Sequence, residues 1–367
     1  MHPQIQYQIA LTLIPGIGPV KAKNLLAYCG SAEAVFKEKQ PALMRIPNIG
    51  EVTAADIASI KEEALTKAEA EMLSMEKHGI HAILFSDKEY PERLKLCEDS
   101  PILLYTKGKL DLNAKRIVSI VGTRNASSYG KSFCEHLIAG IAHLSPFILS
   151  GLAYGIDICA HRCAMNHGLQ TAGVMAHGLD IVYPNLHLSA AREMESNGGL
   201  ISEFASQTKM SPELFPMRNR IVAGMADCTI VLESDVRGGS LITAYQASGY
   251  GREVFALPGR HNDKLSAGCN ELIKKNIAAI LTSPEDLIQY MNWDKTEVRK
   301  PKQLTLLQNH SEEERVIIGI LNEKGKMQID QLSEQSGFAP SKLSGILLNL
   351  EFEGVVKSLP GKVFDIG

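Results

Sequence analysis

The sequence predicts an α/β protein whose core is a mostly parallel sheet, with a helical segment before it and a small unit of helices and a hairpin after it. Residues 80–285 alternate short apolar runs with glycine-rich turns and helical stretches, which is the pattern of a parallel α/β domain. Residues 1–79 carry helical patterns only. At 367 residues the chain is long enough for two or three folding units, so we expect these segments to form separate domains.

Composition limits the possible classes of function. The hydrophobic fraction of 45% supports a buried core, and no stretch reaches the roughly 18 unbroken apolar residues that a membrane helix needs. The N-terminus lacks the basic and apolar regions of a secretion signal. We therefore expect a soluble, cytoplasmic protein without membrane contact. Because the net charge is −3, a nucleic acid would have to be held by a local basic groove.

Two similar turns divide the helical segment. The sequence reads IPGIG at residues 14–18 and IPNIG at residues 46–50, with Asn48 where the first copy has Gly16. Glycine frees the backbone for such tight turns, and the amides of the turn and of the next helix can face a phosphate. Tandem copies predict a SAM-like helix-hairpin-helix domain over residues 1–79.

The charges leave the role of this domain open. Only Lys21 and Lys23 beside the first turn, and Arg45 before the second, are basic. The domain could contact a DNA backbone or could be a packing module.

Nine apolar runs predict the strands of a Rossmann-like core over residues 80–285. Most runs are continuous, as expected for strands that are covered on both faces. The predicted strands are 81–85, 102–105, 116–121, 147–150, 171–175, 200–202, 229–232, 253–257 and 279–281.

After the core the chain turns polar, and we predict a linker over residues 286–310. Structure resumes at Ser311, which with Glu314 has the spacing of a capping box. Three helical patterns and a hairpin pattern over residues 311–367 predict a winged helix. This segment has six Lys or Arg against nine Asp or Glu, and its third helix offers only Lys342. We therefore expect contact with protein, or a degenerate module, in preference to binding in a major groove.

The strongest functional signal is the loop that runs from Gly122 to a helix predicted to begin near Lys131. A glycine at the end of a parallel strand lets the backbone approach a ligand, and the next helix N-terminus attracts anions. Arg124 adds a fork of N–H donors suited to phosphate. The loop lacks the GxGxxG dinucleotide fingerprint. We predict a phosphate site here; the alternative is a loop that only joins strand to helix.

Three further segments predict phosphate contacts at the same edge of the sheet. A second glycine loop begins at Gly151, and its Asp157 and His161 are interpreted as structural. The run Arg218 to Arg220 follows Phe215, which suggests a phosphate clamp beside an aromatic ring on which a base can stack. The Gly-Gly-Ser turn at residues 238–240 opens another helix and forms an anion nest.

These motifs together resemble the DNA-processing protein A family, DprA or Smf. The resemblance rests on GTRNASSYG, SGLAYGID with AH, GLDIVYP, FPMRNRIVAG, GGSLITA with GRE, and ALPG followed by GCNELI, in the order of the family. It covers most of residues 80–285, and the flanking helical and winged-helix segments are similar to those of family members.

The resemblance implies a protein that binds single-stranded DNA, protects incoming strands during natural transformation, and helps to load the RecA recombinase. It implies a homodimer, and a DNA groove that includes Arg124 and the run Arg218 to Arg220, to which Lys131 and Arg252 are added. The predicted DNA-binding residues, from the loops and the resemblance together, are Gly122, Arg124, Lys131, Gly151, Arg218, Asn219, Arg220, Gly238, Gly239, Ser240 and Arg252.

An enzyme is the alternative. The core also resembles hydrolases of nucleoside monophosphates, which need a carboxylate near the glycosidic bond. Glu233 is the best candidate, with Glu203 and Asp157 as others, but the PGGxGT signature of that class is missing. We therefore expect a binding protein and not an enzyme, with no cofactor.

The cysteines predict neither disulfides nor a zinc finger, because the seven are scattered and none forms a CxxC pair. The tightest group, Cys159, His161, Cys163 and His167, lies on one predicted helix. Residues four apart share a helix face, so Cys159 and Cys163 can converge while His161 points elsewhere. One helix therefore does not complete a ligand set, and we expect no metal there.

Overall fold

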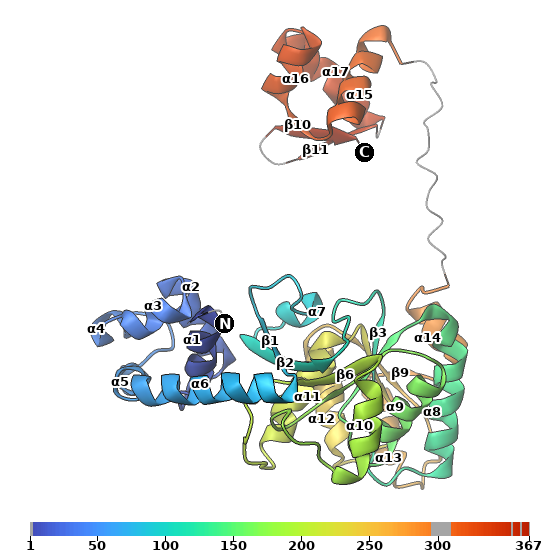
Figure 1. Cartoon of the computed structure of the whole chain (residues 1–367). Coiled ribbons are helices and arrows are strands. Elements are labelled where there is room, and N and C mark those ends of the chain that lie inside the picture. The colour runs from blue at the N-terminus through green and yellow to red at the C-terminus, as the bar shows by residue number, and fades with distance from the viewer. Residues whose placement is uncertain (1–2, 295–309, 354, 360–361, 367) are drawn as a thin grey trace. The chain divides into compact units, whose positions relative to one another are not determined.

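The computed structural model describes residues 3–294, 310–353, 355–359 and 362–366. The chain divides into two compact units, Met1–Trp293 and Asp294–Gly367 (Figure 1). None of the helices within the described residues is long and apolar enough to cross a membrane.

The N-terminal helices contain both predicted turns. Gly16 has φ 74° in the first turn and Asn48 has φ 65° at the equivalent position of the second. Asparagine adopts this left-handed conformation more readily than other non-glycine residues, so the two turns have the same backbone despite the substitution. The helices are α1 (Pro3–Thr12), α2 (Pro19–Cys29), α3 (Ala32–Lys37), α4 (Gln40–Leu43), α5 (Glu51–Ser59) and α6 (Lys61–His78).

This helical segment packs against the α/β core. The long helix α6 is capped at Gly79, where φ is 65°, and the first strand of the sheet begins at His81. The Glu71 carboxylate accepts hydrogen bonds from the Ser206 backbone N–H at 2.9 Å and from its hydroxyl at 3.1 Å. One apolar cluster joins Ile9 and Leu25 to Leu103 and Leu200. The predicted separate N-terminal domain is therefore part of one compact unit.

The core contains a nine-stranded sheet in the order β1-β2-β6-β5-β4-β3-β7-β8-β9. The strands from β6 to β9 in this order are parallel, and β2 is antiparallel to both β1 and β6. All nine predicted strands are present. Their bounds are β1 (His81–Leu84), β2 (Leu103–Gly108), β3 (Ile117–Val121), β4 (Phe147–Ser150), β5 (Thr171–Val174), β6 (Gly198–Ser202), β7 (Cys228–Val231), β8 (Glu253–Ala256) and β9 (Ala279–Ile280).

The strand order places a switch point between β3 and β7. From β3 the chain builds β4, β5 and β6 on one side and then returns to place β7 on the other. The order β5-β4-β3-β7-β8-β9 is that of the Rossmann fold, in which ligands bind outside the carboxyl ends of the strands at this point.

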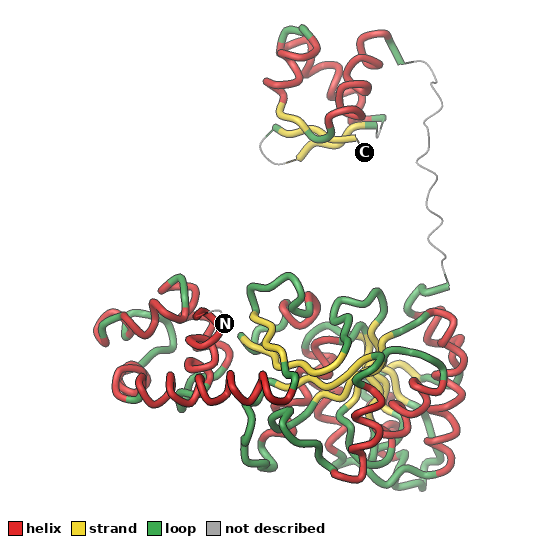
Figure 2. The backbone as a smooth tube through the Cα atoms, in the orientation of Figure 1, coloured by secondary structure: helices red, strands yellow, loops and turns green. Residues whose placement is uncertain are grey.

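Helices cover both faces of the sheet (Figure 2). Along β3, Ile117 and Val121 belong to an apolar cluster with α11 and α12, whereas Val118 and Ile120 belong to a cluster with α8 and α9. This alternation is the two-residue period of a strand. The helices of the core are α7 (Glu92–Lys95), α8 (Ser128–Ile141), α9 (Ile156–Asn166), α10 (Leu188–Met194), α11 (Leu214–Met225), α12 (Gly239–Gly249), α13 (Ala267–Lys274) and α14 (Pro284–Tyr290), with short 3₁₀ helices η1 (Ala142–Leu144) and η2 (Asn185–His187).

The helix α14 corrects the predicted start of the linker. Ser283 and Asp286 form a capping box, and Leu287 is fully buried against the core. Trp293 packs under the guanidinium of Arg116, with 5.7 Å between the guanidinium carbon and the ring centroid. Polar composition concealed this short capped helix, so the core extends to residue 293. The rest of the predicted linker, residues 295–309, lies outside the described residues.

The C-terminal unit has the predicted winged-helix elements. The capping box of Ser311 and Glu314 opens its first helix. The strands β11 and β12 form the predicted antiparallel hairpin, and β10 pairs with β12. The elements are α15 (Glu312–Lys324), β10 (Met327–Gln328), α16 (Ile329–Ser336), α17 (Pro340–Phe352), β11 (Val356–Leu359) and β12 (Val363–Ile366).

Candidate nucleic-acid interface

The loops after β3, β4 and β7 surround a cavity of about 340 Å³ at the switch point of the sheet. The first turn of α12 and the middle of α11 complete its wall. Eight of the predicted residues line this cavity: Gly122, Arg124, Gly151, Arg218, Asn219, Gly238, Gly239 and Ser240.

Arg124 is the exposed cation of this cavity. Its guanidinium carbon lies 5.4 Å from the centroid of the Phe215 ring. The stacking holds the side chain in place, and the guanidinium has no hydrogen-bond or ion-pair partner among the residues that the structure describes. Its N–H donors are therefore available to an anionic ligand.

Arg218 is buried, and most of its donors are used within the protein. One terminal nitrogen donates to the Gly151 carbonyl at 2.8 Å and to the Val174 carbonyl, and Nε donates to the Asn219 side-chain oxygen at 3.0 Å. A Cβ at Gly151 would lie 2.3 Å from that terminal nitrogen, so a side chain here would displace the guanidinium from these acceptors. Burial lowers the pKa of Arg218 to about 10, which leaves it protonated at neutral pH. It contributes a positive charge to the cavity wall and ties β4 to β5.

Asp157 stabilises the loop after β4. Its Oδ2 accepts hydrogen bonds from the backbone N–H groups of Gly151 at 3.0 Å and Ala153 at 3.4 Å. Burial raises its pKa, and the positive charge of Arg218 opposes that shift. The structural interpretation of this residue fits its contacts. His161 is fully buried, with Nδ1 2.7 Å from the Thr171 hydroxyl, and it also lies away from the cavity.

The Gly-Gly-Ser turn presents the N-terminus of α12 to the cavity. Gly238 is the N-cap residue, and a Cβ there would lie 2.1 Å from the Ser234 hydroxyl. The backbone N–H groups of Gly239 and Ser240 have no acceptor within the described part of the chain. Since the positive end of the helix dipole points the same way, this turn suits an anion.

Two neighbouring cavities share Arg124 with the first. One, of about 480 Å³, is lined by Lys131 and Arg162 as well as Arg124. The other is narrow and is lined by Tyr154, His177 and Tyr183. Lys131 therefore lies near the predicted groove, whereas Arg162 was missed. Arg162 follows Cys159 by three residues on the same face of α9, so the two side chains line the same cavity. That spacing is the sequence feature from which its position could have been predicted.

Arg220 and Arg252 lie away from all three cavities. Arg220 is buried in an ion pair with Glu203 and also donates to the Asp99 carbonyl. Residues two apart on a helix point to nearly opposite sides, so Arg218 and Arg220 cannot both face the groove. Arg252 donates to the Arg93 carbonyl at 2.6 Å. The structure therefore gives both arginines packing roles, which corrects their predicted place in the groove.

The proposed catalytic carboxylates are also engaged. Glu233 is fully buried, and its two oxygens accept from the backbone N–H of Ser127 at 2.9 Å and from the Ser127 hydroxyl. The Ser127 hydroxyl also accepts from the Gly130 backbone N–H at 3.2 Å as the N-cap of α8, which begins at Ser128, three residues before the predicted position. Of the three predicted catalytic candidates, Glu233 and Glu203 do not line the cavity and Asp157 does.

The lysines of the first hairpin turn are held by other segments. Lys23 donates to the Ser100 hydroxyl at 3.1 Å and to the Cys97 carbonyl at 3.4 Å, and burial lowers its pKa. Lys21 donates to the Thr53 hydroxyl at 3.1 Å. These contacts favour the packing interpretation of the helical segment.

Three family models match the chain. DNA recombination-mediator protein A matches residues 81–292, the DprA winged helix domain matches residues 301–362, and the SAM-like helix-hairpin-helix tandem matches residues 9–60.

Curated relatives cover most of the chain. The DNA processing protein DprA of Bacillus subtilis is 36% identical over 285 residues, which are 77% of this chain and 95% of that protein. The DprA of Streptococcus pneumoniae is 38% identical over 59% of this chain and 76% of its own length. The protein Smf of Escherichia coli is 31% identical over 80% of this chain and 79% of its own length.

Two solved structures are similar as well. The crystal structure of DprA from S. pneumoniae has a TM-score of 0.67 at 33% identity, covering 77% of this chain and 97% of that one. A structure of DNA processing protein A from Helicobacter pylori, which concerns its single-stranded DNA binding mode, has a TM-score of 0.53 at 28% identity. It covers 59% of this chain and 96% of that one.

Proposed function

This chain belongs to the DprA/Smf family of DNA processing proteins, and from that premise we propose that it binds single-stranded DNA across the carboxyl edge of its sheet. The observation that carries the proposal is the exposed guanidinium of Arg124, which is stacked on Phe215 and free of partners within the described residues. A fork of donors held in this way suits a phosphate oxygen.

The surroundings of Arg124 favour a polymer over a single nucleotide. The three adjoining cavities place Lys131 and Arg162 on one side of Arg124 and the N-terminal turn of α12 on the other. Single strands are held by such cationic tracks together with aromatic rings on which bases stack. Phe215 and the half-exposed Tyr154 and Tyr183 are aromatic rings beside this track.

Arg124→Ala is the direct test. We expect its affinity for a labelled oligothymidylate, measured by fluorescence anisotropy, to fall about tenfold or more, because a hydrogen bond to a charged group contributes about 1.5–3 kcal/mol. The slope of log affinity against log salt should become shallower by about 0.7 for each phosphate that the protein no longer neutralises. The affinity of Arg124→Lys should lie between those of the wild type and Arg124→Ala, since lysine keeps the positive charge but lacks the paired N–H donors of the guanidinium.

Arg192→Ala is the matched control. Arg192 is an exposed arginine on α10 that lines none of the three cavities. Arg192→Ala changes the net charge by the same amount as Arg124→Ala does. It should leave the affinity for single strands and its salt dependence near the wild-type values. An equal loss of affinity in the two alanine variants, or no loss of affinity in Arg124→Ala, would contradict the proposal.

We propose further that binding involves no catalysis. A glycosidic hydrolase needs a carboxylate that reaches the substrate, and both oxygens of Glu233 are hydrogen-bonded to Ser127 away from the cavity. Incubation with nucleoside monophosphates and chromatography of the products should detect no free base. Release of base that depends on Asp157 or Asp235, the two carboxylates that line the cavity, would overturn this part of the proposal.

The finer parts of the function follow from the family resemblance and are proposed on that ground. They are protection of incoming strands in transformation, loading of RecA, and a homodimer. Light scattering of the purified chain tests the dimer. Nuclease protection and RecA filament assembly on strands coated with single-stranded DNA-binding protein test the other two, with Arg124→Ala expected to reduce both.

A further inference from the structure

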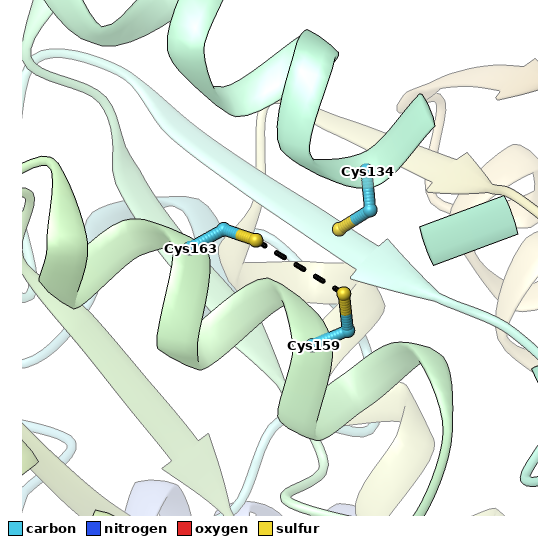
Figure 3. Close-up of side chains that lie close together, drawn as sticks. All are labelled: Cys134, Cys159 and Cys163. Atoms are coloured by element: carbon cyan, nitrogen blue, oxygen red, sulfur yellow. Dashed lines mark hydrogen bonds between the residues drawn. The ribbon is translucent and has the colours of Figure 1, made fainter. Parts of the chain in front are cut away.

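Three cysteine thiols meet between α8 and α9 (Figure 3). Cys159 and Cys163 are four residues apart on α9, and Cys134 comes from α8. Their sulfur atoms all lie within 4.8 Å of one another, and the Sγ atoms of Cys159 and Cys163 are 4.0 Å apart. The predicted convergence of Cys159 and Cys163 is confirmed. The third thiol comes from a different helix.

The separation of the sulfurs suits a shared metal ion. Three sulfurs bound to one zinc ion at about 2.3 Å with tetrahedral angles lie about 3.8 Å from one another. A disulfide between Cys159 and Cys163 fits less well. Cβ atoms four residues apart on a helix are about 5–6 Å apart, whereas a disulfide needs about 3.5–4.5 Å.

The cluster is accessible from one side and faces positive charge. Cys134 is fully buried, but Cys159 and Cys163 line the cavity of about 480 Å³ that also contains Lys131 and Arg162. Lys131 and Arg162 line the same cavity as these two thiols, so two positive charges lie beside the cluster. A thiol must lose its proton to bind a metal, and these two cations offset the charge of a tris-thiolate complex.

We propose that Cys134, Cys159 and Cys163 form a binding site for a thiophilic d¹⁰ cation, Zn(II) or Cu(I), with an open coordination position toward the cavity. Thiolate ligands select these ions over Mg(II) and Ca(II). Three protein ligands with a fourth position open to solvent is a known arrangement for zinc, and three thiolates alone suit Cu(I). No metal was expected here from the sequence, because Cys134 lies on a different helix from Cys159 and Cys163.

Metal binding by the reduced full-length chain tests the site. The protein is equilibrated with Zn(II), or with Cu(I) under anaerobic conditions, against a competing chelator, and bound metal is measured by mass spectrometry. We expect about one ion of the preferred metal per chain. Co(II) serves as a spectroscopic probe, because thiolate ligands give it a charge-transfer absorption whose intensity increases with their number.

Cys159→Ser and Cys29→Ser form the matched pair of variants. Cys29 is similarly part-buried but lies outside the cluster. We expect Cys159→Ser to bind the ion about tenfold more weakly or worse and Cys29→Ser to bind as the wild type does. Thermal unfolding without metal should show that both variants are folded.

Three results would overturn the proposal: no stoichiometric binding of either ion, equal binding by Cys159→Ser and the wild type, or equal loss in the two variants. A fourth result would also overturn it: a mass lower by two hydrogen atoms in the protein isolated under reducing conditions, which would indicate a disulfide. The assay contains no DNA, so its outcome is independent of the proposed function.

Discussion

At the scale of single residues, burial separates the arginines that were predicted together. Arg218 and Arg220 are both nearly inaccessible, at 6% and 5% exposure, but they lie on opposite sides of α11 and satisfy different acceptors. Arg124, by contrast, is exposed and its donors remain open. Ligand binding therefore depends on exposure and on the face of the helix, and less on the number of basic residues in a motif.

Glu203 makes stability depend on pH. Burial raises its pKa from 4.5 to about 7, although Arg220 opposes the shift. Between these values the folded protein keeps a proton that the unfolded chain has released, so the free energy of unfolding should fall as pH rises through this window. The slope from this residue is at most about 1.4 kcal/mol per pH unit. Urea unfolding of Glu203→Gln should show a flatter profile, since glutamine does not titrate but still offers Arg220 an acceptor.

Glu63→Gln is the control for that measurement. Glu63 is exposed, and its hydrogen bond and ion pair with Lys67 lower its pKa below 4.5. Its replacement should leave the slope between pH 4.5 and 7 unchanged. A slope that persists in Glu203→Gln would assign the pH dependence to another group.

Among the elements, the two helix-hairpin-helix turns have a similar backbone conformation although one has glycine and the other asparagine at the equivalent position. Gly18 and Gly50 precede α2 and α5 with nearly equal dihedral angles, φ −84° and −87°, ψ 177° and 176°. The asparagine at position 48 keeps the left-handed conformation that Gly16 has in the first turn. Lys21 and Lys23 beside the first turn donate hydrogen bonds to other segments, which favours a packing role for this pattern.

Asn48→Ala should destabilise this segment. A residue with an ordinary side chain costs about 1–2 kcal/mol in the left-handed conformation, so we expect a loss of about 1 kcal/mol in the free energy of unfolding, measured in urea. Asn48→Gly removes the same amide without that conformational cost and should be much closer to the wild type. Equal destabilisation in both variants would mean that the amide, and not the backbone, is what matters.

For the molecule as a whole, the two units differ in where their basic side chains lie and what they contact. In the winged-helix unit, Lys342 of α17 forms an ion pair with Glu313 at 2.6 Å. The α/β unit has Arg124, Lys131 and Arg162 around adjoining cavities. We therefore expect single-stranded DNA binding to depend on the α/β unit.

Deletion of residues 295–367 tests this division. We expect the affinity for single strands to remain within a few fold of the full-length value, in the same anisotropy assay. Arg124→Ala in the shortened chain should lose as much affinity as it does in the full-length chain. A large loss on deletion alone would instead place a DNA contact in the winged-helix unit or the segment before it.

Local patterns in the sequence are enough to predict the order of elements and the phosphate-compatible turns. Continuous apolar runs predict covered parallel strands, and glycines at strand ends predict close turns, because both signals are local to a few residues. All nine strands, the two hairpin turns, and the loops at Gly122, Gly151 and Gly238 were predictable for this reason.

Which side chains meet could not be predicted from the local patterns and is seen only in the packed structure. Ser127 engages Glu233, Glu203 engages Arg220, and Cys134 of α8 joins the two thiols of α9. Such contacts depend on how helices pack on the sheet, which the spacing within one segment does not encode. For the same reason Arg124 is open to a ligand and Arg220 is not, although both were predicted to bind DNA.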